Sequence, residues 1–258
     1  MKRTLVILLG CCLGVNSCYE LDLNPLSQAS SENWYSSETE IEMSVKDFYR
    51  DDFWPLDNED KTDNFIYRET PSEILKGTFN GQSDDVTKLW ANQYKSIARA
   101  NTLLANMDKA VNMGISEVKL KQYEGEAFFQ RASCYARLVT YFGDVIYVTE
   151  VVDIDKAFTL GRTAKSEIVP KIYEDYDKAI ENLPEKYSGL SSQRATKGAA
   201  LALKARFALY MGDWDIVADA TKKCMDLGIY KLHKDYSDLF LSTTKNSEES
   251  IFLLPRSI

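Results

Sequence analysis

Apolar residues recur at three- and four-residue intervals through most of the chain between positions 37 and 227. This spacing places them on one face of an α-helix, so each periodic stretch predicts a helix that packs against others. The predicted helices span about 37–49, 85–110, 116–142, 166–183, 196–211 and 214–227. Gly143-Asp144 and Gly212-Asp213 end the helices at 142 and 211, and Pro184 ends the helix at 183. The pattern therefore predicts a mainly α-helical fold.

Three of these helices carry a start signal. Ser37-Glu38-Thr39-Glu40 matches a capping box, in which the Ser and the Glu three residues later each accept a hydrogen bond from the other's backbone N–H. Ser166 and Thr196 stand at N-cap positions ahead of two later helices. These signals predict where the helices begin.

Three segments lack the helical period. Residues 145–152 predict a short strand or an extended loop, and Ile251–Leu254 predicts a strand. Residues 50–83 contain Pro55, Pro71 and two glycines and predict a long loop. Because loops longer than about 12–15 residues in compact domains are often functional, this loop is the first place to look for a site.

Helical position assigns several conspicuous side chains to the core. Trp90 and Tyr94 lie on one predicted apolar stripe, and Trp214 follows the turn between two helices. Cys134 and Cys224 fall within helical patterns far apart in the chain, so they are predicted to be small buried hydrophobes rather than a disulfide framework.

The first eighteen residues predict a bacterial lipoprotein signal. Lys2 and Arg3 precede an apolar run of about a dozen residues, which has the length of a secretory h-region and is too short to span a bilayer. Val15-Asn16-Ser17-Cys18 then matches a lipobox, in which the Cys is lipidated and becomes the new N-terminus. Leu8-Leu9-Gly10-Cys11 fits the same pattern but leaves a shorter apolar run. Cys18 is therefore the predicted lipidation site, with Cys11 as the alternative.

Cleavage before Cys18 divides the chain into a signal peptide (1–17), a polar tether (18–36) and a folded region (37–258). Acyl chains on the Cys would give a stable anchor, because each buried CH₂ contributes about 0.8 kcal/mol. An uncleaved anchor, or a plain secretory signal with incidental cysteines, remains open. The clustered cysteines are not predicted to bind a metal, because no other Cys or His ligand lies nearby.

Charge and composition exclude several function classes. The net charge is -8 and no basic stripe is present, which argues against nucleic-acid binding. A single histidine, His233, argues against His-based catalysis and His-rich metal sites. Glu126 and Arg131 are a charged pair within an apolar helix, and either a partly buried bridge or a solvated face fits the pattern.

Enzyme motifs are lacking as well. The sequence contains no nucleophile elbow, P-loop or zinc signature, and no motif singles out a pair of carboxylates for glycosidase chemistry. The acidic residues from Asp57 to Asp63 lack the spacing of a calcium loop. We therefore expect no catalytic residues, no metal and no cofactor.

The stretch ALALKARFALYMGDWDIVADATKKCMDL (200–227) resembles a tetratricopeptide helix–turn–helix unit. Small residues occupy close-packing positions, and a Gly-Asp turn separates the two helices. The signature Ala of the second helix would fall at Val217, one residue from Ala218. Internal repetition is otherwise weak, although helix pairs are visible. Such units stack, because one helix pair cannot bury its apolar face alone.

Five stretches, together with the lipobox and the following LDLNP, resemble the SusD/RagB family of outer-membrane lipoproteins. They are LWANQYKSIARANTLLANMD (89–108), GEAFFQRASCYARLVTYFGDV (125–145), GRTAKSEIVPKIYEDYDKAIENLP (161–184), RATKGAALALKARFALYMGDWDIVADA (194–220) and NSEESIFLL (246–254). They follow the family's order over nearly the whole chain. The resemblance departs at Ile146, where the family's turn has Pro, and in length, since family members are typically about twice as long. It therefore implies an N-terminal portion whose C-terminal half is missing.

The resemblance implies a surface-exposed, lipid-anchored, glycan-binding protein rather than an enzyme. Its fold would be a tetratricopeptide-like helical superhelix, a right-handed α-α solenoid with few short strands. It would deliver oligosaccharides to a SusC-like TonB-dependent transporter in the outer membrane. Acidic residues just after the lipidated Cys, here Glu20 and Asp22, are similar to the signal that exports such lipoproteins to the cell surface.

Sugar binding uses aromatic faces and planar polar groups, and the loop 50–83 has this mixture. Trp54, Asp63, Tyr67 and Arg68 are the predicted ligand-binding residues. In the alternative interpretation, the two aromatic residues pack the loop onto the scaffold and the acids are solvated. The alternative function is a tetratricopeptide-like protein–protein interaction scaffold at the outer membrane without its own ligand site. The exposure of the aromatic residues would distinguish the two functions.

Overall fold

The computed structural model describes residues 34–55, 61, 62, 64, 66, 68, 70–187, 193–244 and 247–254. The predicted signal peptide, the predicted lipidation site Cys18, most of the predicted tether, and the predicted ligand-binding residues Asp63 and Tyr67 lie outside the described residues.

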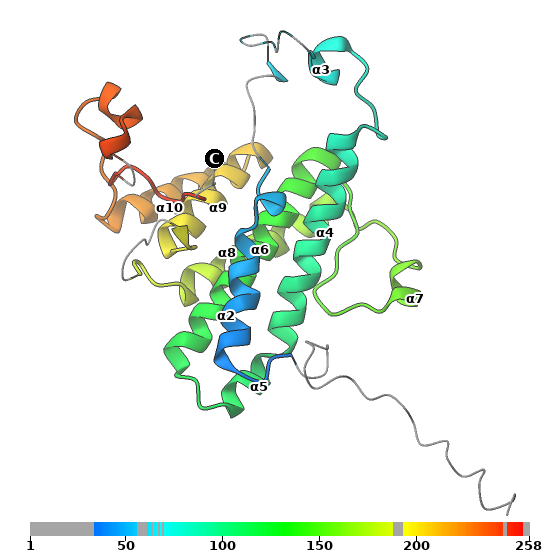
Figure 1. Cartoon of the computed structure of the whole chain (residues 1–258), viewed down its shortest axis with the longest axis vertical. Coiled ribbons are helices and arrows are strands. Elements are labelled where there is room, and N and C mark those ends of the chain that lie inside the picture. Colours follow the sequence, from blue (N-terminus) through cyan, green and yellow to red (C-terminus); the bar gives the residue numbers. More distant parts are fainter. Residues whose placement is uncertain are drawn as a thin grey trace, which may run out of the picture.

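The described chain is built from helices, as Figure 1 shows. They are α2 (Glu38–Lys46), η1 (Asp47–Tyr49), η2 (Asp51–Phe53), α3 (Glu73–Lys76), α4 (Asp84–Ala105), α5 (Met107–Asn112), α6 (Glu117–Phe142), α7 (Ile154–Ala157), α8 (Lys165–Asn182), α9 (Lys197–Met211), α10 (Trp214–Asp226), η5 (Ser237–Phe240) and η6 (Ser242–Thr244). The prediction of a mainly α fold is confirmed.

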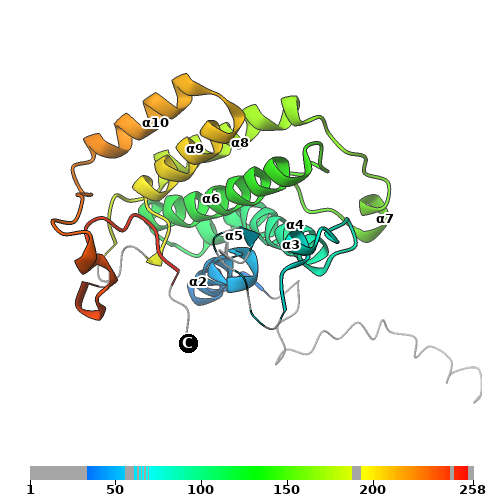
Figure 2. The same ribbon diagram turned by 90° about the horizontal axis from the view of Figure 1, so that it is seen from above.

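The long helices stack in chain order. α4 packs against α6, α6 against α8, α8 against α9 and α9 against α10, so each buries an apolar face against its neighbour (Figure 2). α2 lies against α4 and α6. Gly212 ends α9 in the left-handed conformation (φ 81°), and its N–H bonds to Ala208 and Leu209 carbonyls, which turns the chain into α10. The predicted helix pair at 200–227 is confirmed.

Local sequence signals account for most helix ends. The capping box at Ser37 and Glu40 and the cap at Thr196 are confirmed. The cap at Ser166 is wrong, because α8 already begins at Lys165. The Lys165 N–H donates to Asp144 Oδ1 at 2.8 Å, so a carboxylate from the preceding loop satisfies it.

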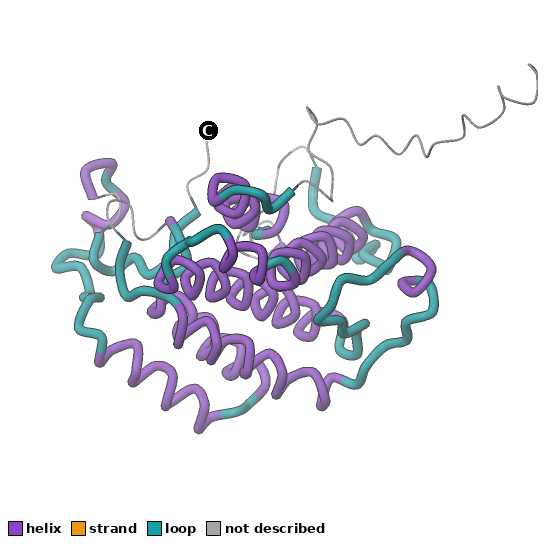
Figure 3. The backbone as a smooth tube through the Cα atoms, turned by 90° about the horizontal axis from the view of Figure 1, so that it is seen from below, coloured by secondary structure: helices purple, strands orange, loops and turns teal. Residues whose placement is uncertain are grey.

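The predicted strands do not form in the described residues, as Figure 3 shows. Val145 forms one isolated antiparallel bridge with Thr163, so residues 145–152 are an extended loop. Ile251–Leu254 also forms no strand within the described chain. Its apolar side chains contribute to helix packing instead, with the Phe252 ring 5.1 Å from that of Trp54 and 5.5 Å from that of Phe129.

The buried residues form one large cluster and two smaller ones. The large cluster lies between α6, α8 and α9 and includes Phe129, Tyr135 and Tyr176. Cys134 and Cys224 are buried and free, as predicted. The aromatic residues of the α4 stripe also belong to the packing, since Trp90 contacts Phe142 edge-to-face with ring centroids 5.0 Å apart.

The prediction that Trp214 belongs to the core is wrong, since the side chain lies at the start of α10 and is 67% exposed. Among the described helices, none combines the length and the apolar character needed to cross a membrane.

Glu126 and Arg131 are both buried, so the solvated alternative is wrong for each. They brace the stack through other partners and not through each other. Arg194 Nη2 donates to Glu126 Oε1 at 2.5 Å, which ties α6 to the segment before α9. Arg131 on α6 binds Asp175 on α8.

Candidate functional site

A cavity of about 480 Å³ opens between the C-terminal ends of α6 and α9. The buried Tyr176 of α8 lines it, together with the end of η2 and the extended segment 252–254. The lining residues are Trp54, Pro55, Ser133, Ala136, Arg137, Thr140, Tyr141, Tyr176, Leu203, Arg206, Phe207, Tyr210, Phe252, Leu253 and Leu254. Because helices supply most of these residues, the helical stack fixes the positions of their backbones.

Trp54 reaches this cavity but is not an exposed platform. It is 5% exposed, and its ring stacks on Phe129 at 5.7 Å between ring centroids. Its indole N–H donates to the Phe48 carbonyl at 2.9 Å. Trp54 therefore anchors the start of the 50–83 loop to the helices and presents only a small part of its surface to the cavity.

Two arginines line the cavity. The Arg137 guanidinium lies 4.5 Å above the Trp54 ring, and its Nη1 donates to the Phe53 carbonyl at 3.2 Å. Arg206 is exposed on α9, and within the described residues it forms no ion pair. Burial raises the pKa of Tyr176 to about 12, against the opposing influence of the two arginine charges. The cavity therefore combines two arginine side chains with an aromatic lining.

Two tyrosines stand at the mouth of the cavity. Tyr141 on α6 is 59% exposed and Tyr210 on α9 is 61% exposed. Aromatic rings at a cavity mouth can stack on sugar rings, and hydroxyl and guanidinium groups can bond to sugar hydroxyls. The described residues thus provide the two kinds of group that glycan binding requires.

Of the predicted ligand-binding residues, Trp54 lines the cavity, and Arg68 is exposed on the loop. Asp63 and Tyr67 lie outside the described residues, so the structure does not place them.

The sequence reasoning missed Arg137, Tyr141, Arg206 and Tyr210, although the sequence carries a signal for them. ARLVTYFGD (136–144) and ARFALYMGD (205–213) share the pattern A-R-x-x-x-Y-x-G-D. In each, Arg and Tyr stand four residues apart on one helix face. The internal repetition is therefore stronger than predicted. Residues from both copies of the repeat line one cavity.

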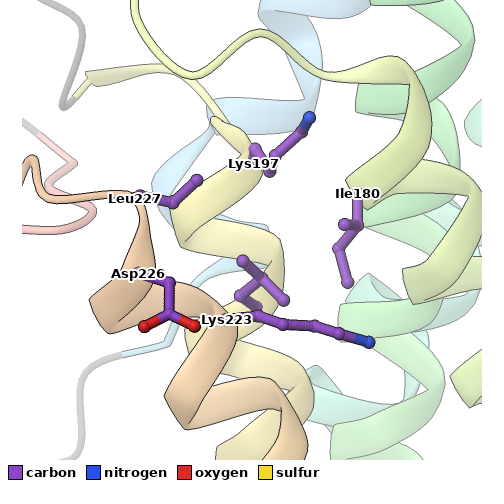
Figure 4. A pocket seen from close by; sticks show the side chains of 6 residues that line it. Ile180, Lys197, Lys223, Asp226 and Leu227 are labelled. Carbon is purple, nitrogen blue, oxygen red and sulfur yellow. The ribbon is translucent and has the colours of Figure 1, made fainter.

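A second hollow of about 270 Å³ lies between α8, α9 and α10 (Figure 4). Ile180, Leu201 and Leu227 make its surface apolar, and Lys197 and Lys223 flank it. The Lys223 ammonium donates to Asp219 at 2.7 Å. Asp226 adds one carboxylate, but none of the described residues that line this hollow is aromatic, so the arginine-lined cavity is the stronger candidate site.

This chain is similar in sequence and structure to known proteins. A profile described as "Starch-binding associating with outer membrane", of the SusD-like type, matches residues 22–209. SusD-like protein P25 of Formosa agariphila is 29% identical over 176 residues, which cover 67% of this chain and 32% of that protein.

Solved structures agree with the profile. A SusD-like protein from Bacteroides fragilis is 26% identical with a TM-score of 0.74, covering 86% of this chain and 45% of its own. A laminarin-binding SusD-like protein is 24% identical with a TM-score of 0.74, covering 84% of this chain and 51% of its own. The chain thus spans about half the length of these solved relatives and a third of P25.

One solved relative from Bacteroides fragilis is described as a SusD-like carbohydrate-binding protein and another as a laminarin-binding SusD-like protein, and neither description names an enzyme. The helical stack agrees with theirs in fold, and the profile spans well over half of the chain. The chain therefore belongs to the SusD-like family, the proteins described as starch-binding and associated with the outer membrane.

Proposed function

We propose that this protein is a lipid-anchored, cell-surface glycan-binding protein that passes oligosaccharides to a SusC-like TonB-dependent transporter of the outer membrane. The observation that carries the proposal is the cavity between α6 and α9, where tyrosine rings stand beside arginine and hydroxyl groups. Such a combination suits pyranose rings, which offer an apolar face for stacking and a rim of hydroxyls for hydrogen bonds.

Family membership supports this proposal. One solved protein of similar fold is described as laminarin-binding, and another was solved with a xylogluco-oligosaccharide. Laminarin and xylogluco-oligosaccharides are both glycans of several sugar units. An open cavity at the surface of a helical scaffold suits such ligands better than a closed pocket would.

The proposed binding surface combines the cavity with the predicted loop residues Trp54, Asp63, Tyr67 and Arg68. Trp54 joins the loop to the cavity, because it lines the cavity and lies at the start of the loop. The proposal includes ligand contacts from Asp63, Tyr67 and Arg68.

Glycan-array binding of the purified chain, followed by calorimetry on each hit, tests the proposal. Tyr210→Ala should weaken binding by about fivefold, as expected for losing one aromatic stacking contact of about 1 kcal/mol. Trp214→Ala is the matched control, because Trp214 is a similarly exposed aromatic residue outside the cavity lining. If no glycan binds the chain, or if both variants bind like the parent, the proposed site is wrong.

The proposed anchor has a separate test. Palmitate labelling of cells that express the chain should be lost in Cys18→Ser and retained in Cys11→Ser. Labelling that persists in Cys18→Ser and disappears in Cys11→Ser would move the lipidation site to Cys11. Co-purification of the acylated chain with a TonB-dependent transporter from outer membranes tests the partner.

A further inference from the structure

Trp34 and Tyr35 fasten the chain to the helical stack just ahead of α2. Tyr35 is buried, and the Trp34 indole N–H donates to Ser44 Oγ on α2 at 2.8 Å. The Tyr35 backbone is left-handed (φ 67°), a conformation that costs a residue other than glycine about 1–2 kcal/mol. Surrounding contacts must hold such a residue in place, so the point at which the chain joins the stack is fixed.

This attachment point lies at the end of the stack where α5 passes into α6. Trp34 and Ile115 both pack on the buried cluster that joins α2, α4, α5 and α6. Ile115 lies in the turn 113–116, between α5 and α6. Lys119, in the first turn of α6, pairs with Glu38, the first residue of α2. We call α5, this turn and the first turn of α6 the tether end of the stack (Figure 1).

The proposed lipid anchor lies a short chain length from the tether end. Sixteen residues separate the sequence positions of Cys18 and Trp34. Since a chain spans at most about 3.3–3.6 Å per residue, Trp34 cannot lie more than about 58 Å from an acylated Cys18. Such a link presents the tether end to the bilayer at a high effective concentration, so lipid contacts that are individually weak are sufficient.

Two exposed valines flank the turn at the tether end. Val111 on α5 is 58% exposed, and Val118 in the first turn of α6 is 78% exposed. The exposed charged residues beside them are of both signs: Asp108, Lys109, Glu117 and Lys121. Apolar side chains among mixed charges suit the boundary between the headgroups and acyl chains of a zwitterionic bilayer, where lysine stems also pack against apolar groups.

We propose that the tether end rests on the bilayer surface, with Val111 and Val118 in contact with lipid. The proposal rests on the proposed lipid anchor at Cys18. It also gives the scaffold an orientation, because α6 runs from the tether end to the cavity. Arg137 stands nineteen residues beyond Val118 on α6, a rise of about 29 Å at 1.5 Å per residue. The cavity would thus be held clear of the bilayer and open to glycans.

Contact quenching by lipids measures this orientation. The acylated chain, carrying Cys224→Ser, is purified and placed on phosphatidylcholine vesicles that contain a headgroup nitroxide lipid. A fluorescent label is attached at Asn112→Cys on α5 or, as the comparison, at Lys88→Cys near the start of α4. The α4 axis rises about 26 Å between position 88 and its end beside α5, so the two labels report on opposite ends of the stack. The label at 112 should lose fluorescence, and the label at 88 should not.

Val118→Asp tests the lipid contact itself. The change places a charge in an exposed position, so the melting temperature should stay the same and the acyl chains should still hold the protein on the vesicles. The quenching at position 112 should fall to that at position 88. Ile154→Asp is the matched control, because Ile154 is 77% exposed on α7, outside the tether end, and its replacement should leave the quenching unchanged.

The outcomes separate this proposal from the proposed anchor. If the vesicle-bound chain shows equal quenching at positions 112 and 88, or quenching at 112 that survives in Val118→Asp, the orientation is wrong and the anchor stands. If the purified chain carries no acyl group and does not bind the vesicles, both are wrong. Glycan binding is measured separately and is unaffected by either result.

Discussion

Arg131 on α6 holds Asp175 on α8 in a two-pronged ion pair, with Nε to Oδ2 at 2.7 Å and Nη2 to Oδ1 at 2.8 Å. Both side chains are almost fully buried, and Arg131 Nη1 also donates to Asn101 Oδ1 on α4 at 2.9 Å. Three consecutive long helices of the stack therefore meet at one guanidinium. A buried charge needs its partners, because water cannot replace them.

Asp175→Ala should lower the free energy of unfolding by about 3–5 kcal/mol, because it leaves Arg131 buried without its counter-charge. Urea denaturation followed by circular dichroism measures this. Asp226→Ala removes one partner of the exposed Lys222–Asp226 pair and should change stability by less than about 1 kcal/mol. The double variant Arg131→Met/Asp175→Leu should recover much of the loss. Equal small effects at both sites would contradict a bracing role for the buried pair.

Trp54→Ala should destabilise the chain by about 3–5 kcal/mol, since it removes a buried ring that packs on Phe129 and Phe252. Trp214→Ala should stay within about 0.5 kcal/mol, because that side chain is largely exposed. Thermal unfolding of the two variants measures the difference. Any loss of glycan binding in Trp54→Ala must be compared with its stability, and for this reason Tyr210 is the better probe of the site.

Gly198→Ala should destabilise the chain by about 1–3 kcal/mol through overpacking. A Cβ at Gly198 would clash with the hydroxyl group and ring of Tyr230, so the Tyr230 side chain or the segment that carries it would have to move. Gly161→Ala is the control, because no atom lies within 4 Å of its added Cβ. Combining Gly198→Ala with Tyr230→Ala should remove the clash, and the double variant should cost less than the sum of the single changes. Additive effects would argue against the contact.

Burial raises the pKa of the Cys134 thiol to about 11. In a chain with Cys11, Cys12, Cys18 and Cys224 replaced by Ser, a thiol-reactive dye at pH 8 should label Cys134 only after denaturant is added, because the folded thiol is neutral and inaccessible. The raised pKa also sets the sign of the pH effect. Its contribution to stability is complete below the ordinary value of 9 and is lost as the pH rises toward 11. Rapid labelling of Cys134 in the folded chain would contradict this.

Helix positions followed from the sequence because they depend on neighbours in the chain. The apolar period, the capping box at Ser37 and the turn at Gly212 act within one or two helical turns, and each was confirmed. The N-cap prediction at Ser166 is wrong because a more distant carboxylate, Asp144, accepts the hydrogen bond from the first N–H of α8. The strand prediction for Ile251–Leu254 is wrong because an apolar run forms a strand only if another strand pairs with it.

The sequence by itself determined the helical stack and the resemblance to the SusD-like family, since periodicity and motif order are properties of the chain. The burial of Trp54, the partners of Glu126 and Arg131, and the cavity were decided by tertiary structure. Arg137 and Arg206 are almost seventy positions apart, and only the packing of α6, α8 and α9 brings them to one site. Local signals specify where each helix begins and ends, whereas a binding site requires side chains from several helices to converge.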